Sequence, residues 1–267
     1  MAGTIIETAE SVEDQTAEQY KICGVLMGPS GSGKSTAAAA TLPGRKLVLE
    51  YDGREQSLVG LPNVKVIKLH SKDFKSPQTW MDAEKLRKEL WVLAQRGKLE
   101  YDSIIEDGLT MMSRYAMSWA LLLDPKRGLG DTPAKQHYMP QMKEISEHVL
   151  SMKALPVNYV LTAHLELIEN EENKTTMWLP KVTGKLRTEV AGWFNECYYC
   201  YRKEGPKGTS SGLKYYWITG GTGEMDFFKS SLNQFGKYWR DPVEVDLDKK
   251  PAGFQMLLEK RFGSAGQ

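Results

Sequence analysis

The sequence contains few cysteines, with three in 267 residues. Three thiols exclude a disulfide framework, so the composition favours a reducing compartment. Cys197 and Cys200 form a C-x-x-C motif, but no second cysteine pair and no nearby histidine completes a metal site. The motif also lies in a predicted strand, residues 196–202, whose alternation directs the two sulfurs to opposite faces. We therefore expect structural cysteines rather than a zinc or redox site.

The sequence also lacks a charge excess of either sign and any long apolar run. The formal net charge is +1, so no global field attracts the chain to nucleic acid or to a membrane. No stretch of about 18 apolar residues is present, and the N-terminal stretch is acidic, which argues against a membrane span and a signal peptide. We expect no membrane partner and a cytoplasmic location. Hydrophobic residues still make up 41% of the chain, enough for the core of one large α/β domain.

One glycine-rich segment carries the strongest functional signal. Residues 28–35 read GPSGSGKS and match the P-loop pattern G-x-x-x-x-G-K-[ST]. Its glycines let backbone N–H groups turn inward as a nest for phosphates, while Lys34 reaches the β- and γ-phosphates and Ser35 ligates Mg²⁺. An apolar run at 22–27 and an Ala-rich helix at 35–42 flank the loop in the required order. The predicted ATP-binding residues are Gly28, Pro29, Ser30, Gly31, Ser32, Gly33, Lys34, Ser35 and Thr36.

Strands and helices alternate along the first part of the chain. Strands are predicted at 46–51, 64–69, 101–106 and 157–163, and helices between Ser76 and Gly97, at 109–123 and at 134–153. A charged hairpin over 165–179 and aromatic strands at 196–202 and 213–218 follow. This order predicts an α/β fold with a mostly parallel sheet flanked by helices and an antiparallel C-terminal extension. We divide the chain into a flexible arm (1–20), an ATPase domain (21–240) and a tail with a short helix (241–267).

Polar residues end three of the predicted strands, where ligands bind in open α/β sheets. Asp107 is predicted to hold Mg²⁺ through water, unless it is only a helix cap, whereas alternation turns Glu106 away. Asp52 is preferred to Glu50 as the acid that polarises the attacking water, although Asp-Gly is also a common turn. His164 is predicted to sense the γ-phosphate, with an ordinary core or surface histidine as the alternative.

These motifs in this order resemble the RecA-like P-loop ATPases, and most closely the Sak-type single-strand annealing ATPases of phages. The resemblance covers roughly residues 21–235. It rests on GPSGSGKST, LEYDG, YDSIIEDGLT, VLTAH and GKLRTEVAGWFNECYYC, with YYWITGGTGEMDFFKSSL as the closing strands. It implies a RecA-like core in which Lys34 and Ser35 bind nucleotide and metal, Asp107 is the Walker B acid and His164 is the sensor.

The sequence departs from the family pattern at two places. Asp52 stands where the family usually has a catalytic glutamate, so hydrolysis is expected to be slow. Lys229 is implied as a cation that reaches the γ-phosphate of a neighbouring subunit. An arginine often follows that lysine in the family, whereas Ser230 and Ser231 follow it here.

In RecA-like proteins the loops after the Walker B helix and after the sensor strand line the DNA path, and the second corresponds here to the residues after His164, which include the segment 174–187. This segment reads KTTMWLPKVTGKLR, with four cations, no acid and one tryptophan. Cations of this kind follow a phosphate backbone while an aromatic ring stacks on a base. The alternative is a solvated hairpin whose tryptophan packs on the core. The predicted DNA-binding residues are Lys174, Trp178, Lys181, Lys185 and Arg187.

We therefore expect an ATPase that binds single-stranded DNA and promotes annealing or strand pairing. Ile5 and Ile6 of the arm are expected to dock on a neighbouring subunit, and such head-to-tail contacts give rings or filaments. A single-strand binding protein is a candidate partner, and the host cytoplasm is the expected location of a phage-encoded chain. Two alternatives stay open: a nucleotide or small-molecule kinase, and a nucleotide-gated binding module with little turnover.

Overall fold

In the computed structural model, which describes residues 15–73, 75–126, 131–169, 174–205 and 212–263, strands and helices alternate as far as residue 163. The first elements are β1 (Cys23–Met27), α1 (Lys34–Thr41), β2 (Lys46–Glu50), η2 (Glu55–Leu58), β3 (Val64–Lys68), α2 (Gln78–Gln95), β4 (Ser103–Asp107), α3 (Leu109–Leu122), α4 (Lys135–Ala154) and β5 (Asn158–Ala163). The predicted strands and helices of this part of the chain are therefore confirmed, with small shifts at their ends.

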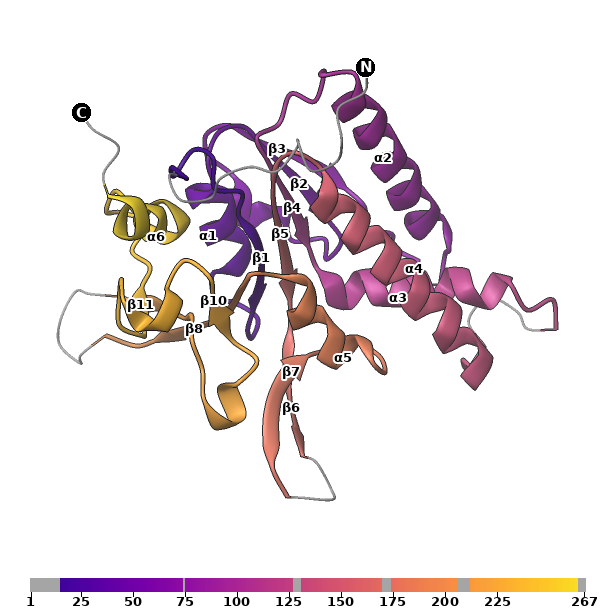
Figure 1. The fold of residues 1–267 in the computed structure, drawn as a ribbon. Helices are drawn as coiled ribbons and strands as arrows, with labels where there is room; N and C mark the ends of the chain where they lie inside the picture. The colour runs from indigo at the N-terminus through magenta and orange to yellow at the C-terminus, as the bar shows by residue number, and fades with distance from the viewer. Residues whose placement is uncertain (1–14, 74, 127–130, 170–173, 206–211, 264–267) are drawn as a thin grey trace, which may run out of the picture.

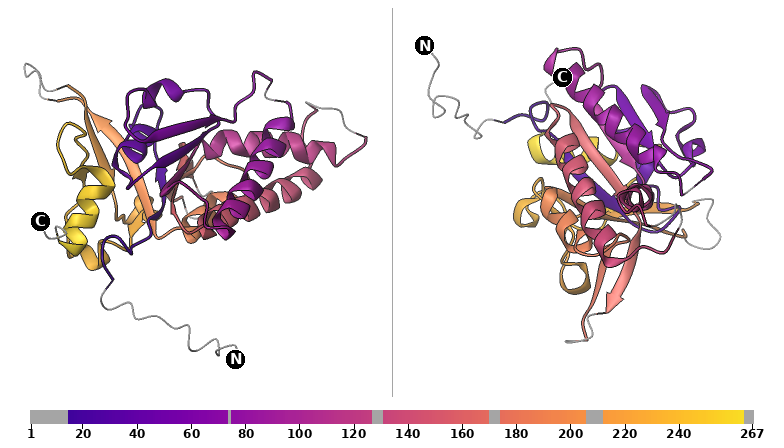
Figure 2. Two further views of the ribbon diagram at one scale, coloured as in Figure 1. Left: turned by 90° about the horizontal axis from the view of Figure 1, so that it is seen from above. Right: turned by 90° about the vertical axis from the view of Figure 1, so that its right-hand side faces the viewer.

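A hairpin and a set of short elements follow β5. They are β6 (Leu165–Glu169), β7 (Thr176–Pro180), α5 (Leu186–Glu189), η3 (Val190–Trp193), β8 (Glu196–Lys203), β9 (Lys214–Ile218), η4 (Gly223–Met225), β10 (Lys229–Ser230), η5 (Gln234–Gly236), β11 (Val243–Glu244) and α6 (Gly253–Phe262). Strands β6 and β7 pair only with each other and project from the body of the molecule (Figures 1 and 2). The hairpin predicted from the sequence is thus present, and its turn lies outside the described residues.

Nine strands of the described chain form one sheet in the order β11-β9-β8-β1-β5-β4-β2-β3, with β10 paired to β8. The strands from β8 to β3 pair in parallel, whereas β9 and β10 pair antiparallel with β8, and β11 pairs antiparallel with β9. The predicted fold class is therefore confirmed. One detail differs, because β8 was assigned to the antiparallel extension but pairs in parallel with β1. The connection from β7 through α5 and η3 is long enough for the crossover that a parallel neighbour requires.

Helices lie on both faces of the sheet (Figure 1), and the sheet separates two apolar clusters. Helices α2, α3 and α4 contribute to one buried cluster, and α1 and α6 contribute to the other. Alternation along each strand divides its side chains between the two, so that Val25 lies in the first cluster and Leu26 in the second. Cys197 and Cys200 are divided in the same way, and both are free and buried. The predicted opposite orientation of the two sulfurs is therefore confirmed.

The residues after 240 pack on the sheet and on the first helix. Strand β11 extends the sheet beside β9, and α6 covers α1. The ring of Phe254 lies 5.9 Å from Tyr198 and 5.0 Å from Trp217, and its backbone N–H donates to Thr41 Oγ1 at 3.1 Å. The short helix expected in the tail therefore forms part of the second apolar cluster.

At the other end of the chain, residues 1–14 of the predicted arm, with Ile5 and Ile6, lie outside the described part. Tyr20 is described, and its hydroxyl donates to the buried Glu196 at 2.8 Å. Among the helices of the described residues, none combines the length and the apolar character that a membrane crossing needs.

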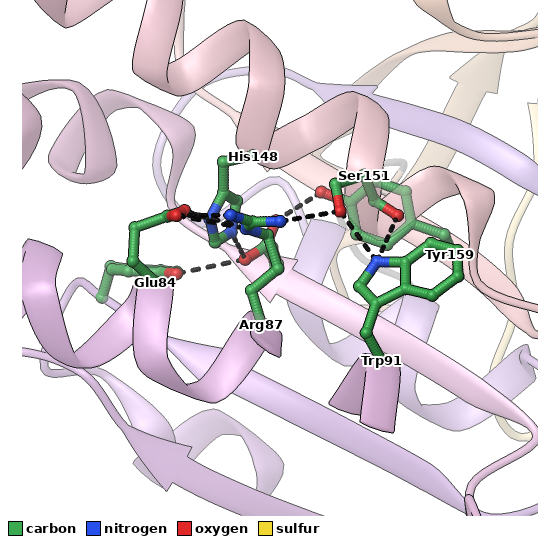
Figure 3. A network of polar contacts seen from close by, with 8 residues as sticks. Glu84, Arg87, Trp91, His148, Ser151 and Tyr159 are labelled. Atoms are coloured by element: carbon green, nitrogen blue, oxygen red, sulfur yellow. Dashed lines mark hydrogen bonds and ion pairs between the residues drawn. The ribbon is translucent and has the colours of Figure 1, made fainter. Parts of the chain in front are cut away.

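A network of buried and half-buried charges connects β4 to the helices that cover it (Figure 3). His148 on α4 lies between two carboxylates, with Nε2 2.7 Å from Glu106 of β4 and Nδ1 2.6 Å from Glu84 of α2. Tyr51 and Tyr159 also donate hydrogen bonds to Glu106, and Arg87 forms a 2.6 Å ion pair with Glu84. Glu106 therefore makes its hydrogen bonds and its ion pair on the face of the sheet that α2, α3 and α4 cover, as the alternation of β4 predicts.

The two carboxylates set the charge of His148. Burial alone would lower the pKa of His148, but the charge of Glu106 and hydrogen bonds to both acids raise it to about 9. Burial opposes ionisation of Glu84 as well, yet hydrogen bonds from His148 and Arg87 lower its pKa to about 2. The folded protein therefore holds a protonated histidine between two ionised glutamates.

We predict that the free energy of unfolding declines from about pH 6.5 to pH 9. The pKa of His148 is raised from 6.5 to about 9 in the folded state, so its contribution is complete below pH 6.5 and is lost as the pH passes 9. Glu84 acts in the opposite direction, since its contribution is present above pH 4.5 and is lost as the pH falls toward 2. Urea denaturation at a series of pH values measures the free energy of unfolding over both its alkaline limb, set by His148, and its acid limb, set by Glu84.

His148→Gln should flatten the alkaline limb and cost about 3–5 kcal/mol at pH 6, because the buried Glu106 and the half-buried Glu84 lose their shared cation. His70→Gln is the control, since His70 is half-buried and contacts Glu50 instead, and this variant should keep the alkaline decline. An unchanged alkaline limb in His148→Gln would show that the network does not determine the pH dependence.

Candidate nucleotide-binding site

The carboxyl ends of four neighbouring parallel strands meet at one hollow. The glycine loop follows β1, Asp52 follows β2, Asp107 ends β4 and His164 follows β5. Parallel strands end at the same edge of a sheet, so these segments converge although they are far apart in sequence. The hollow has a volume of about 390 Å³. Its lining residues include Ser30, Gly31, Ser32, Gly33, Lys34, Ser35, Thr36, Asp52, Asp107 and His164.

The glycine loop lies tightly against the end of β8. A Cβ atom at Gly28 would lie 2.1 Å from the carbonyl oxygen of Cys200, and Gly33 has a φ of 80°, which favours glycine. Lys34 folds back over the loop, where Nζ donates to the carbonyl oxygens of Gly28 and Pro29, both at 2.9 Å. Burial lowers the pKa of Lys34, because an ammonium in this position has few contacts with water. The loop thus forms a concave cradle with one buried cation at its base.

The two predicted metal ligands touch each other. Ser35 Oγ donates to Asp107 Oδ1 at 2.7 Å, and Thr162 Oγ1 donates to the same oxygen at 2.6 Å. Burial raises the pKa of Asp107, while the hydrogen bonds from Thr162 and Ser35 act against that rise. Hydroxyl and carboxylate oxygens are the donor set that Mg²⁺ prefers, so these residues fit the ion. Thr162 was not identified from the sequence, where it is one of several threonines without a distinguishing motif.

The structure distinguishes the two acids near the end of β2. Glu50 is fully buried, and its Oε1 accepts hydrogen bonds from the backbone N–H groups of Asp52 (2.8 Å) and Arg54 (2.9 Å). Its Oε2 lies 3.0 Å from Nδ1 of His70. Asp52 lines the hollow instead, and its buried Oδ1 has no hydrogen-bond partner among the described residues. Glu50 therefore holds the backbone of the loop, and Asp52 is the one of the two acids that lines the hollow.

His164 connects the hollow to the projecting hairpin. Its Nε2 lies 3.7 Å from Oδ2 of Asp52, and its backbone N–H donates to Thr110 Oγ1 at 3.4 Å. Strand β6 begins at the next residue, and at the far end of the hairpin the N–H of Lys181 donates to the carbonyl of His164 at 2.8 Å. Both ends of the hairpin therefore meet at the residue that faces Asp52.

The five predicted DNA-binding residues of the hairpin segment fall into two groups. Lys174, Lys181 and Lys185 are exposed. Trp178 is half-buried and stacks on Tyr199 of β8, with ring centroids 6.1 Å apart, which matches the packing alternative stated for it. Arg187 donates to the carbonyl of Val182 at 2.7 Å and pairs with Glu166 at 3.2 Å. The three lysines are therefore the accessible cations of the set.

Lys229 does not reach the hollow of its own chain. It is exposed on β10, opposite Cys197 of β8, and lines a separate depression together with Arg240. The two serines after it, Ser230 and Ser231, donate to the buried carboxylate of Glu196 at 2.5 and 2.6 Å. The departure from the family pattern at these positions thus has a structural role, because the serines satisfy a buried acid.

Besides Thr162, the residues of the hollow that were not assigned to it from the sequence include Arg54, Arg202 and Tyr215. Arg54 Nη1 donates to Ser30 Oγ at 2.8 Å. Arg202 lies near the end of β8, and its Nη1 would be 3.1 Å from a Cβ atom added at Gly31. Tyr215 of β9 lies over Gly33 and also lines an adjoining apolar slot of about 120 Å³. Only Arg54 had a sequence signal, since it lies two residues after Asp52. Arg202 and Tyr215 lie at the hollow because β8 pairs with β1 and β9 pairs with β8.

A family model described as an AAA domain matches residues 20–223. A comparison with curated proteins gave no match. The matched region contains the glycine loop, Asp52, Asp107 and His164, as well as Arg202 and Tyr215, so it includes all residues that line the hollow. It also covers more than half of the chain, and the protein therefore belongs to the AAA-domain family of P-loop ATPases.

Proposed function

We propose that the protein hydrolyses ATP and uses the nucleotide state to control a single-strand-binding hairpin during DNA annealing or strand pairing. The AAA domain supports nucleotide binding and ATPase activity in general terms. The observation that carries the hydrolytic part is the convergence of Lys34, Asp107, Asp52 and His164 on one hollow. The phage recombination role rests on the Sak-type resemblance of the motifs.

Different residues of the hollow have different roles in hydrolysis. Backbone N–H groups of the glycine loop and Lys34 hold the phosphates. Mg²⁺ bound at Ser35 and Asp107 would neutralise charge on the phosphate oxygens. Asp52, which lines the hollow, orients the attacking water and takes up its proton. Tyr215 offers a ring beside Gly33 and Thr36, where a nucleoside attached to the phosphates would lie.

The link to DNA runs through His164. Loss of the γ-phosphate would change the surroundings of His164 and Asp52, and both ends of the β6–β7 hairpin meet at His164. The three exposed lysines of residues 174–185 would follow the phosphate backbone of a single strand. A head-to-tail oligomer would bring several such hairpins to one strand and would place Lys229 beside a neighbour's nucleotide.

The kinase alternative has little support. A kinase closes an arginine over the phosphates, and residues 165–187 contain a single arginine. That residue, Arg187, is engaged with Glu166 and with the carbonyl of Val182. The hairpin segment therefore offers no unengaged arginine for a lid.

The first prediction concerns ATP binding. Lys34→Ala should weaken nucleotide binding by about 10- to 100-fold and abolish turnover, because hydrogen bonds to charged groups contribute about 1.5–3 kcal/mol each. Titration with a fluorescent ATP analogue measures the affinity, and circular dichroism checks the fold. Lys65→Ala on the exposed edge of β3 is the matched control and should behave as wild type. Normal turnover by a folded Lys34→Ala protein would contradict the assignment of the phosphate site.

A second prediction separates the two acids. Asp52→Asn should lower kcat by about 10²- to 10⁴-fold with little change in ATP affinity, since an amide cannot accept the proton of water. Glu50→Gln should mainly lower the melting temperature, because Glu50 holds the loop backbone. The roles are reversed if Glu50→Gln is inactive but as stable as wild type while Asp52→Asn still turns over ATP.

The third prediction tests the hairpin as a DNA site. Lys181→Ala combined with Lys185→Ala should weaken single-strand binding about equally for all sequences and should reduce the salt slope by roughly 0.7 per lost contact. Fluorescence anisotropy with labelled oligonucleotides over a range of salt concentrations gives both quantities. Lys85→Ala with Lys88→Ala, two exposed positions on α2, is the control. Equal affinity and slope in both double variants would place the DNA site elsewhere.

A further inference from the structure

Two arginines of the same chain reach the glycine loop from opposite sides. In the sheet, β8 lies on one side of β1, and β2 lies on the other side beyond β5 and β4. Arg54 comes from the segment after β2 and donates to Ser30 Oγ at 2.8 Å. Arg202 comes from β8 and lies against Gly31. A Cβ atom added at residue 31 would lie 3.1 Å from its Nη1. Both residues line the hollow, so the loop lies between two guanidinium groups.

The charges around the loop favour an anion. Arg54 and Arg202 are exposed, and neither forms an ion pair with an acid in the described part of the chain. They add to the buried ammonium of Lys34, whose pKa is lowered by burial and also by the positive charge of Arg54. The same hollow contains the carboxylates of Asp52 and Asp107, so the three cations leave it with a net positive charge, which favours a bound polyanion. A triphosphate supplies that charge, and guanidinium groups bind its oxygens in a fork.

The position of Arg54 is the more specific of the two. It follows Asp52 by two residues, and Glu50 accepts hydrogen bonds from the backbone N–H groups of both. The same buried carboxylate therefore sets the acid and the arginine in one loop at the end of the hollow that also holds His164. Donors fixed before the reaction stabilise developing charge better than mobile ones, because they need no reorganisation.

We propose that Arg54 and Arg202 act in cis as catalytic residues, binding the γ-phosphoryl group and the β–γ bridge and stabilising the charge that develops there. This inference rests on the proposed ATP hydrolysis. The water oxygen forms a bond to the γ-phosphorus, the bond to the bridging oxygen breaks, and its electron pair leaves with ADP while Asp52 takes the water proton. Each chain then carries its own transition-state cations, and the exposed Lys229 is not needed for the chemical step.

Single substitutions test the catalytic role. Arg54→Ala should lower kcat by about 10²- to 10³-fold, the usual effect of removing one fixed donor, and Arg202→Ala should also lower it. Nucleotide affinity should fall much less than kcat, and Arg54→Lys should restore part of the rate because it keeps the charge. Arg96→Ala, at the exposed end of α2, removes an arginine far from the loop and should match wild type. Wild-type kcat in both Arg54→Ala and Arg202→Ala would overturn the inference.

Mixing variants separates action in cis from action in trans. If Arg54 acts within its own chain, no ratio of Lys34→Ala to Arg54→Ala subunits contains an intact site, so the mixture should stay inactive. If Arg54 acted on a neighbour, some interfaces of the mixture would combine an intact Lys34 with an intact Arg54, and the reappearance of turnover would refute the proposal. Absence of turnover in the wild-type protein itself would instead count against the proposed ATPase function.

Discussion

The contact between Gly28 and the end of β8 is the constraint on which the site depends. A side chain at residue 28 would overlap the carbonyl of Cys200, so only glycine allows the loop and this strand to lie so close together. The close approach places Arg202 beside Gly31, and the pairing of β9 with β8 brings Tyr215 over Gly33. A motif usually treated as a local strand–loop–helix unit therefore also depends on residues of β8 and β9, which are neighbours in the sheet but distant in the sequence.

Two adjacent residues at the end of β4 have separate tasks because the strand alternates. Asp107 faces α1 and accepts hydrogen bonds from Ser35 and Thr162. Glu106 faces the opposite layer and forms an ion pair with His148 inside the protein. Buried ion pairs contribute less to stability than their Coulomb energy suggests, because both partners lose hydration, but they fix geometry strongly. The pairing of Glu106 thus anchors the strand end that presents Asp107.

Local patterns in the sequence predicted much of the fold and the centre of the site. The P-loop, the alternation of β4 and the opposite faces of Cys197 and Cys200 depend only on near neighbours, so they could be inferred from spacing. The parallel pairing of β8, the packing of Trp178 on Tyr199 and the presence of Arg202 at the loop depend on which strands become neighbours. Strand order is a property of the whole chain, and no short motif encodes it. Ser230 and Ser231 show the same limit, because their partner Glu196 is distant in sequence.

The packing of α6 on α1 has a consequence for the order in which the molecule is made. Helix α1 leaves the ribosome early, directly after the phosphate loop, but Phe254 donates its N–H to Thr41 across 213 positions of sequence. The part of α1 that α6 covers is therefore exposed until residues 253–258 have been synthesised, which takes on the order of 10–50 s at 5–20 residues per second. The nascent chain thus has its phosphate loop long before the layer behind that loop is closed. During this interval the uncovered apolar surface is open to chaperones. Helix α1 completes its native packing only after α6 has formed.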